Sequence, residues 1–135
     1  MGSPRYGIKC TWPEKNGNIR PTRLIGFGKK RGKDARALKA GDKMLVYAVH
    51  TRKVLGIAEV VGAHPYELLP GDRFPHRVRL QWLACVPKRK GIHPSALGLR
   101  LNPQFRPYQA ITPKQFAEGL AALVKQSGHR PRMAA

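Results

Sequence analysis

Two apolar segments in the middle of the chain constrain its fold more than any other feature. Residues 43–50 and 54–62 are dense in Val, Leu, Ile, Met and Tyr, and a three-residue polar connection, Thr51-Arg52-Lys53, separates them. Two such runs joined by a short polar link are typical of an antiparallel β-hairpin. We therefore expect this hairpin to occupy the centre of a sheet.

Further strands should flank the hairpin. Apolar and polar side chains alternate on both sides of it, which is the period of a half-buried strand, and the stretches between are rich in Pro, Gly and polar residues. Trp82 falls on the apolar side of this alternation, which favours a place in the core. The pattern predicts strands over residues 5–11, 77–86 and 99–101, and surface loops over residues 12–23 and 63–76.

Helical signals are fewer. Asp34 is a plausible N-cap for a short helix over residues 35–40, which Gly41 would close. Thr112 followed by Pro113 predicts the start of a last helix. Its apolar residues lie on one face, as expected for a helix that packs on a core: Phe116, Leu120, Leu123 and Val124.

The expected strands outnumber the helices and follow one another directly. This order predicts an α+β fold around a small mixed or antiparallel barrel of about five to six strands, flanked by short helices and a C-terminal helix. No repeat or linker divides the chain. We expect one domain over residues 1–127 and a disordered basic tail over residues 128–135.

The charge of the chain indicates its partners. It has 26 Lys and Arg against 7 Asp and Glu, a formal charge of +19. Such a charge attracts phosphate polymers. The alternative is a protein that is basic only because the proteins of its organism are in general rich in Arg. The chain contains no apolar run long enough to cross a membrane and no signal-like N-terminus, so we expect no membrane partner and a cytoplasmic location, with association with the nucleoid as an alternative.

The central hairpin also resembles the EVE domain family. Residues 37–62 contain a Gly41-Asp42 turn, a strand that includes Tyr47, and the following strand Gly56-Ile57-Ala58-Glu59-Val60, as the family does. Other segments similar to the family follow in order: His64-Pro65-Tyr66-Glu67, Phe74-Pro75-His76-Arg77-Val78, and Arg106 with Ile111-Thr112-Pro113 and Phe116. The resemblance covers roughly residues 5–125.

This resemblance implies a PUA-like pseudo-barrel, related in fold to the YTH domains that read methylated RNA bases. It also implies a pocket for one flipped, often modified nucleobase, where the first strand, the segment before the short helix and the central hairpin meet. Tyr6 and Cys10 stand near positions where many members have Trp and Ser. Phe27 is the nearest aromatic residue to a Trp that members commonly carry before the short helix.

A reader of single bases needs an aromatic face, polar groups for the base edge and cations for the flanking phosphates. Phe27 lies between two glycines that would let a ligand approach, and its alternative is core packing. Trp12 is a second stacking candidate, or a cap on the barrel. Tyr47 is a candidate for pocket contact, with an ordinary core tyrosine as the alternative. His50 is a candidate for a hydrogen bond to the ligand, with a solvated histidine at the hairpin tip as the alternative. The expected base pocket consists of Lys9, Cys10, Thr11, Trp12, Phe27, Gly28, Tyr47, Val49 and His50.

Basic residues around and after Phe27 are the expected phosphate contacts. A single Lys is more often a solvated surface residue, but this chain has few acids with which its cations could pair. The position of a second cluster, Lys88-Arg89-Lys90, relative to the pocket does not follow from the sequence. The expected phosphate-binding residues are Lys29, Lys30, Arg31, Lys33, Arg36 and Arg106.

Motifs for catalysis are missing from the sequence. It shows no nucleophile elbow, no phosphate-binding Gly-rich loop and no set of His, Cys and carboxylates at metal-ligand spacing. Seven carboxylates and five scattered His leave little material for acid–base pairs. We therefore expect no enzymatic activity, no cofactor and no metal.

The sequence thus favours a module that binds DNA or RNA and holds a flipped, modified base, either alone or with a partner enzyme. Two alternatives stay open. One is a binder of a free nucleotide-like small molecule in a defence or accessory complex. The other is a non-specific basic RNA- or DNA-binding protein. The dependence of binding on salt and on base modification separates them.

Overall fold

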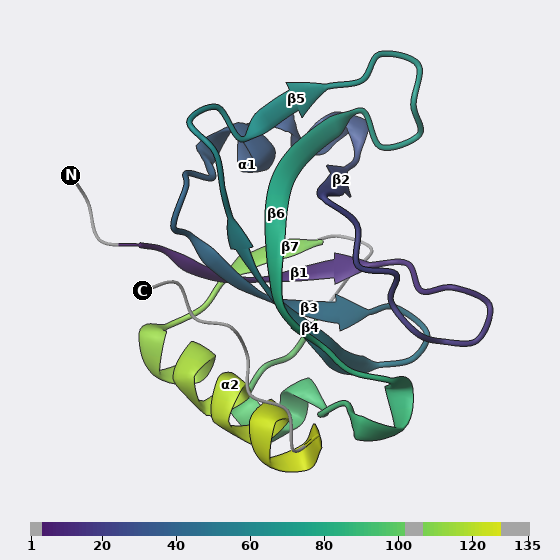
Figure 1. The fold of residues 1–135 in the computed structure, drawn as a ribbon, viewed down its shortest axis with the longest axis vertical. Coiled ribbons are helices and arrows are strands. Elements are labelled where there is room, and N and C mark those ends of the chain that lie inside the picture. Colours follow the sequence, from purple (N-terminus) through teal and green to yellow (C-terminus); the bar gives the residue numbers. More distant parts are fainter. Residues whose placement is uncertain (1–3, 102–106, 128–135) are drawn as a thin grey trace.

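The computed structural model describes residues 4–101 and 107–127, which form a curled sheet with helices at its two ends (Figure 1). The helices are α1 (Gly32–Ala37) and α2 (Pro113–Ser127), with the 3₁₀ turns η1 (Lys29–Arg31), η2 (Lys88–Lys90) and η3 (Pro94–Leu97). The strands are β1 (Tyr6–Thr11), β2 (Leu24–Phe27), β3 (Lys43–Ala48), β4 (Lys53–Val60), β5 (Tyr66–Leu68), β6 (His76–Cys85) and β7 (Tyr108–Ala110).

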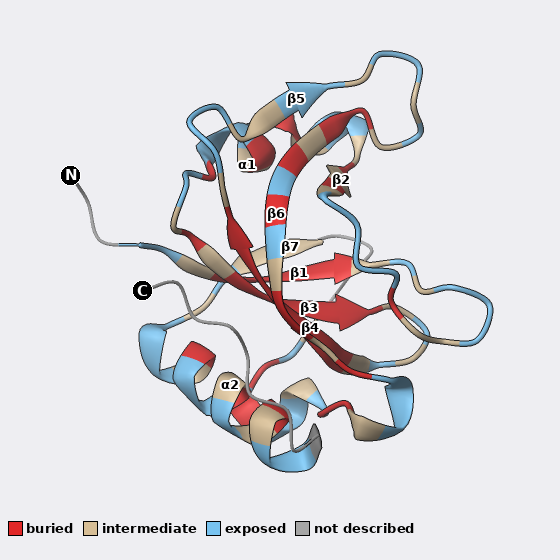
Figure 2. Ribbon diagram, in the orientation of Figure 1, coloured by how far each residue is buried: buried red, intermediate tan, exposed pale blue. Residues whose placement is uncertain are grey.

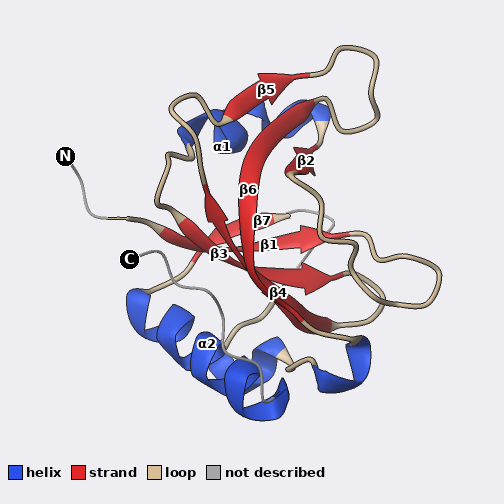
Figure 3. Ribbon diagram, viewed as in Figure 1, coloured by secondary structure: helices blue, strands red, loops and turns tan. Residues whose placement is uncertain are grey.

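The sheet is mixed, and its strand order is β2-β6-β4-β3-β1-β7, with β5 also paired to β6. The antiparallel β3–β4 hairpin lies in its centre, as the sequence predicts, and β1 runs parallel to β3. The long strand β6 pairs with β2 and β5 through its first half and with β4 through its second half. Its bend curls the sheet into a half-barrel (Figure 3). The expected α+β architecture is confirmed.

The core lies inside this curl. Both hairpin strands are buried almost throughout, and the exposed residues gather on helices and loops (Figure 2). Helix α2 packs against β1 and β3, and the rings of Tyr6 and Phe116 lie 4.8 Å apart. The predicted cap is present, because Thr112 and Gln115 exchange two hydrogen bonds of 3.0 Å. Neither helix is long and apolar enough to cross a membrane within the described residues.

The first helix differs from its prediction. It begins at Gly32 and ends at Ala37, Arg31 takes the N-cap position, and Asp34 lies inside the first turn. The reason is that η1 leads directly into the helix, so the chain is already turning before Asp34. The carboxylate of Asp42 then accepts the backbone N–H of Lys39 at 2.9 Å and holds the chain out of the helix.

Three short strands were also missed, the first being β2, because no strand was predicted over residues 24–27. β5 lies inside the expected loop over residues 63–76, and the expected strand over residues 99–101 is absent, with β7 following instead. β5 and β7 have three residues each, so neither shows an alternating pattern. Pairing with β6 and β1 creates them, and this cannot be read locally. The tail predicted over residues 128–135 lies outside the described residues.

Candidate nucleic-acid interface

A cleft of about 1050 Å³ lies between the end of β1 and the part of the sheet formed by β2 and the first half of β6. Residues of the loop over residues 12–23 form one wall, and those of η1 also line the cleft. Many of the residues predicted as site residues meet here. They are Lys9, Cys10, Thr11, Trp12, Gly28, Lys29, Lys30, Arg31 and Val49.

Phe27, predicted to stack on a base, lies in the core instead. Its side chain is 1% exposed and does not line the cleft. Burial alternates along β2, so Phe27 is buried in the core while Leu24 and Gly26 are partly exposed and line the cleft. The ring of Phe27 lies beneath the cleft wall, with the Lys9 Nζ 4.7 Å from its centroid.

The structure also places other predicted residues away from the cleft. Tyr47 is buried in a central strand, and His50 lies at the tip of the β3–β4 turn. Lys33 and Arg36 are exposed on α1, where the Arg36 guanidinium covers the Tyr66 ring at 5.1 Å. These four do not line the cleft, because strand position or helix direction turns them elsewhere. Arg106 lies outside the described residues.

Lys9 has the most unusual environment in the cleft. It is 5% exposed, and its Nζ donates a hydrogen bond of 2.6 Å to the Cys10 carbonyl. No ion pair joins it to a carboxylate within residues 4–101 and 107–127. Burial lowers its pKa to about 8, and the neighbouring Cys10 opposes part of this shift. At neutral pH the cleft therefore contains a buried ammonium group, which has further N–H donors besides the one bonded to the Cys10 carbonyl.

Trp82 lines the cleft, although its alternation with Val78 and Leu80 predicts a core position. The pairing of β4 with β6 slips by one residue opposite Trp82, between Ile57 and Ala58. This irregularity leaves Trp82 half-buried. Its indole N–H donates a 2.7 Å hydrogen bond to the Thr22 carbonyl, and so ties the cleft wall to β6.

Phe74 supplies another aromatic surface that sequence reasoning did not assign. The Asp72 carboxylate accepts hydrogen bonds from the Phe74 backbone N–H at 3.0 Å and from the Arg77 guanidinium at 2.9 Å. These two bonds hold the pKa of Asp72 below its usual range. A Cβ on Gly26 would lie 2.7 Å from the Phe74 Cβ, so only glycine leaves room for this ring. The sequence signal was the Gly26 position within an apolar strand.

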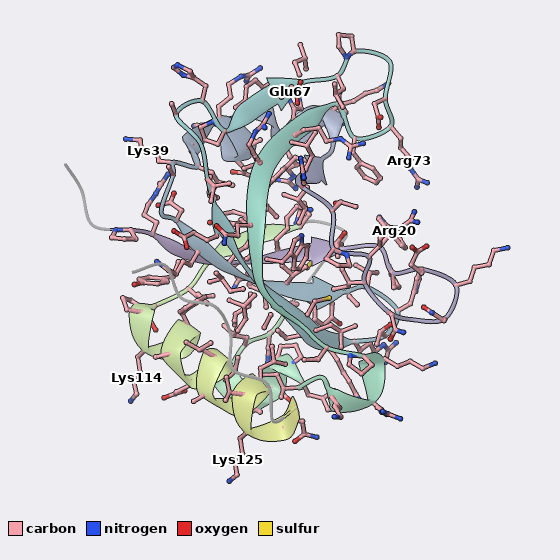
Figure 4. All side chains as sticks on the ribbon, viewed as in Figure 1. Arg20, Lys39, Glu67, Arg73, Lys114 and Lys125 are labelled. Carbon is pink, nitrogen blue, oxygen red and sulfur yellow. The ribbon has the colours of Figure 1, made fainter. Side chains whose placement is uncertain are left out.

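Cations outnumber carboxylates around the cleft. Lys29 and Lys30 are exposed on η1, and Arg20 projects from the same side of the molecule as Arg73 (Figure 4). Glu14 is the carboxylate in the lining, and it lies 3.6 Å from the Arg20 guanidinium. The cleft therefore favours an anionic ligand. Within residues 4–101 and 107–127, no group of three His, Cys, Asp or Glu side chains could hold a metal ion.

Comparison with solved structures identifies the fold. The YTH domain of Zygosaccharomyces rouxii MRB1, solved with N6-methyladenosine RNA, matches at a TM-score of 0.59 and 14% identity, over 91% of this chain and 90% of that one. Human THYN1, solved with DNA containing 5-methylcytosine, matches at 0.54 and 13% identity, over 90% and 97%. The chain has a PUA-like fold.

A hypothetical protein from Leishmania major matches at a TM-score of 0.61 and 17% identity, over 92% of this chain and 97% of that one. No family model and no curated protein sequence matches the chain. At these identities the likeness establishes the fold, and what the cleft binds has to be argued from the cleft itself.

Proposed function

We propose that the protein binds single-stranded DNA or RNA and holds one nucleobase, modified by a small group such as methyl, in the cleft. The observation that carries this proposal is the composition of the cleft. Half-buried Phe74 and Trp82 and exposed Trp12 meet the buried ammonium of Lys9 there, on a chain of charge +19. Aromatic faces and cations together are what single-strand binding requires.

The size of the cleft supports a nucleotide as its ligand. Its volume of about 1050 Å³ is just above the roughly 300–1,000 Å³ of small-molecule sites, so it has room for a nucleotide. A base would stack on the ring of Phe74 or Trp82, while Lys9 donates to an acceptor on the base edge. Lys29 and Lys30 would contact the flanking phosphates. Duplex DNA would have to extrude the base first.

The neighbours in structure support the same reading, since two of them were solved with methylated nucleic acids. The resemblance of residues 37–62 to EVE domains agrees with it. We further propose that the protein is a reader without catalytic activity of its own. It would act in the cytoplasm, alone or by bringing a partner enzyme to marked sites.

A titration with matched oligonucleotides tests the proposal. Each would be single-stranded or duplex and carry plain cytosine, 5-methylcytosine, 5-hydroxymethylcytosine or N6-methyladenine, at ~50 and ~200 mM salt. We expect a preference of about tenfold or more for one modification at both salt concentrations, and its loss in Phe74→Ala, because one stacked base contributes about 1–3 kcal/mol.

Leu68→Ala is the matched control, because Leu68 is an exposed apolar side chain on β5, outside the cleft. It should bind like the unaltered protein. Equal affinity for all strands that collapses at the higher salt would instead indicate a non-specific basic protein. Tight binding of free nucleotides without binding of strands would indicate a small-molecule site.

A further inference from the structure

A second hollow lies on the other side of Trp12. Its volume is about 510 Å³, and it shares Trp12, Pro13 and Glu14 with the cleft. His50 and Lys88 line this hollow and not the cleft. The two spaces are therefore adjacent, and Trp12 lines both of them.

Trp12 is unusually exposed for its size. It is 53% exposed, and its ring contacts that of His50, with centroids 5.0 Å apart and planes 52° from parallel. The imidazole supports one side of the indole and leaves much of its surface to solvent. An indole with this much of its surface in solvent is available to stack on a further ring.

The backbone holds this pair in place. The Thr51 hydroxyl donates a 2.7 Å hydrogen bond to the Gly17 carbonyl, and the Lys88 N–H donates one of 2.8 Å to the Asn18 side-chain oxygen. These bonds join the loop that carries Trp12 to the β3–β4 turn and to η2. His50 and Arg52 have φ of +72° and +62°, so the tight β3–β4 turn fixes the direction in which the His50 side chain leaves the backbone.

The charge of the hollow suits a phosphate. Lys15 and Lys88 line it, and Glu14, the carboxylate in its lining, lies 3.6 Å from the Arg20 guanidinium. The basic turn η2 continues from Lys88 along the same surface. An aromatic platform between cations fits a nucleobase whose phosphate lies beside them.

We propose that the Trp12–His50 pair is a second stacking platform, which holds the base of the nucleotide next to the one in the cleft while Lys88 and Lys15 contact its phosphate. The proposal rests on the proposed function, because it needs a strand that already occupies the cleft. It gives a role to the second basic cluster and to His50, neither of which the cleft explains.

The test compares the modified mononucleotide with the same nucleotide extended by one and by two residues, for the protein and three variants. His50→Gly removes the ring and tolerates the positive φ, and Lys88→Gln removes one charge. Lys125→Gln, an exposed residue on α2 that lines neither the cleft nor the hollow, is the control (Figure 4). We expect extension to raise the affinity about tenfold in the protein and the control.

This gain should fall to about twofold or less in His50→Gly and be reduced in Lys88→Gln. If extension of the nucleotide raises the affinity equally in all four proteins, the stacking platform is wrong, and the proposal that the cleft binds a modified base is unaffected. A gain that depends on His50 and Lys88 without any preference for modification would support the platform and overturn the reader. If no strand binds, both proposals are wrong.

Fluorescence gives an independent measurement. The sequence contains two Trp residues, so Trp82→Phe leaves Trp12 as its one indole. Stacking of a base on Trp12 should quench that emission when the extended oligonucleotide binds, and the mononucleotide should quench it less. Unchanged emission with the bound extended strand would count against the platform.

Discussion

Lys9 is the residue whose chemistry the fold alters most. Its amine is buried beside the Phe27 ring with a carbonyl as its hydrogen-bond partner, and its pKa falls from 10.5 to about 8. Below pH 8 the folded protein carries this desolvated charge, while the unfolded chain carries a solvated one. Between about pH 8 and 10.5 the unfolded state binds more protons, so stability rises with pH through this window.

Replacement of Lys9 by Met should therefore stabilise the fold at neutral pH. We expect the free energy of unfolding at pH 7 to rise by up to about 3 kcal/mol, since a change of one unit in pKa corresponds to about 1.4 kcal/mol. The advantage should shrink as the pH rises to 9.5. Cys10, whose pKa burial raises to about 11, stays protonated over this range.

Urea unfolding of both proteins at several pH values measures this difference. If the difference in the free energy of unfolding between the two proteins does not change with pH, then burial of the Lys9 ammonium does not destabilise the fold. The same variant should bind nucleic acid less tightly, because the base edge loses its donor. More stability with less affinity is the pattern expected of a group kept for function.

The prediction of cleft residues was right at the regular end of a strand. It was wrong where the pairing register of a strand decides which side chains face the cleft. Lys9, Cys10 and Thr11 reached the cleft because the end of β1 forms its wall. Phe27 and Trp82 exchanged their expected positions, since Phe27 lies in the core and Trp82 lines the cleft. Alternation within β2 buries the first, and the slip between β4 and β6 turns the second toward the cleft. That slip depends on a partner strand and leaves no local trace.

At the scale of elements, β4 and β6 pack most closely at Gly56, where the Trp82 ring of β6 lies against the backbone of β4. A Cβ at this position would lie 2.6 Å from the Trp82 ring. Gly56→Ala should therefore displace the indole, weaken its bond to the Thr22 carbonyl and lower the free energy of unfolding by about 1–3 kcal/mol. Nucleic-acid affinity should fall with it, because Trp82 lines the cleft.

Chemical unfolding followed by circular dichroism checks the stability. Gly28→Ala is the matched control, since a Cβ there would meet nothing within 4 Å and its φ of −64° suits alanine. That variant should unfold like the original protein. If Gly56→Ala unfolded like it too, the tight packing of Trp82 on β4 would be refuted.

Strong local patterns predicted the elements that they encode. The central hairpin and the capped helix α2 were both predicted from the sequence. The structure contains the antiparallel hairpin and the Thr112 cap of the helix. The short strands β5 and β7 escaped because three residues are too few to show a period. The cleft itself could not be predicted, since it needs the curl of the sheet that β6 produces.

At the scale of the whole molecule, charge should govern affinity for any strand. The chain carries +19, and three ion pairs neutralise little of it within the described residues. If about six phosphates are neutralised on binding, affinity for an unmodified strand should fall about 10³-fold between ~50 and ~200 mM salt. Discrimination between modified and plain bases should change little.

Titrations at four or five salt concentrations give the slope of log K against log salt. A slope near zero for the plain strand would show that backbone contacts contribute little. A preference for modification that decays in parallel with affinity would assign the discrimination to the phosphates rather than to the base.

The scattered origin of the cleft has a consequence for protein synthesis. Lys9 comes from the first strand, Trp82 from the sixth, and Pro107 from just before the last. β1 cannot pair until β3 has been made, and β2 must wait for β6. A growing chain on the ribosome, surrounded by RNA, therefore presents basic segments but no finished cleft. If the protein binds a base as proposed, selective capture can begin only when almost the whole polypeptide has emerged.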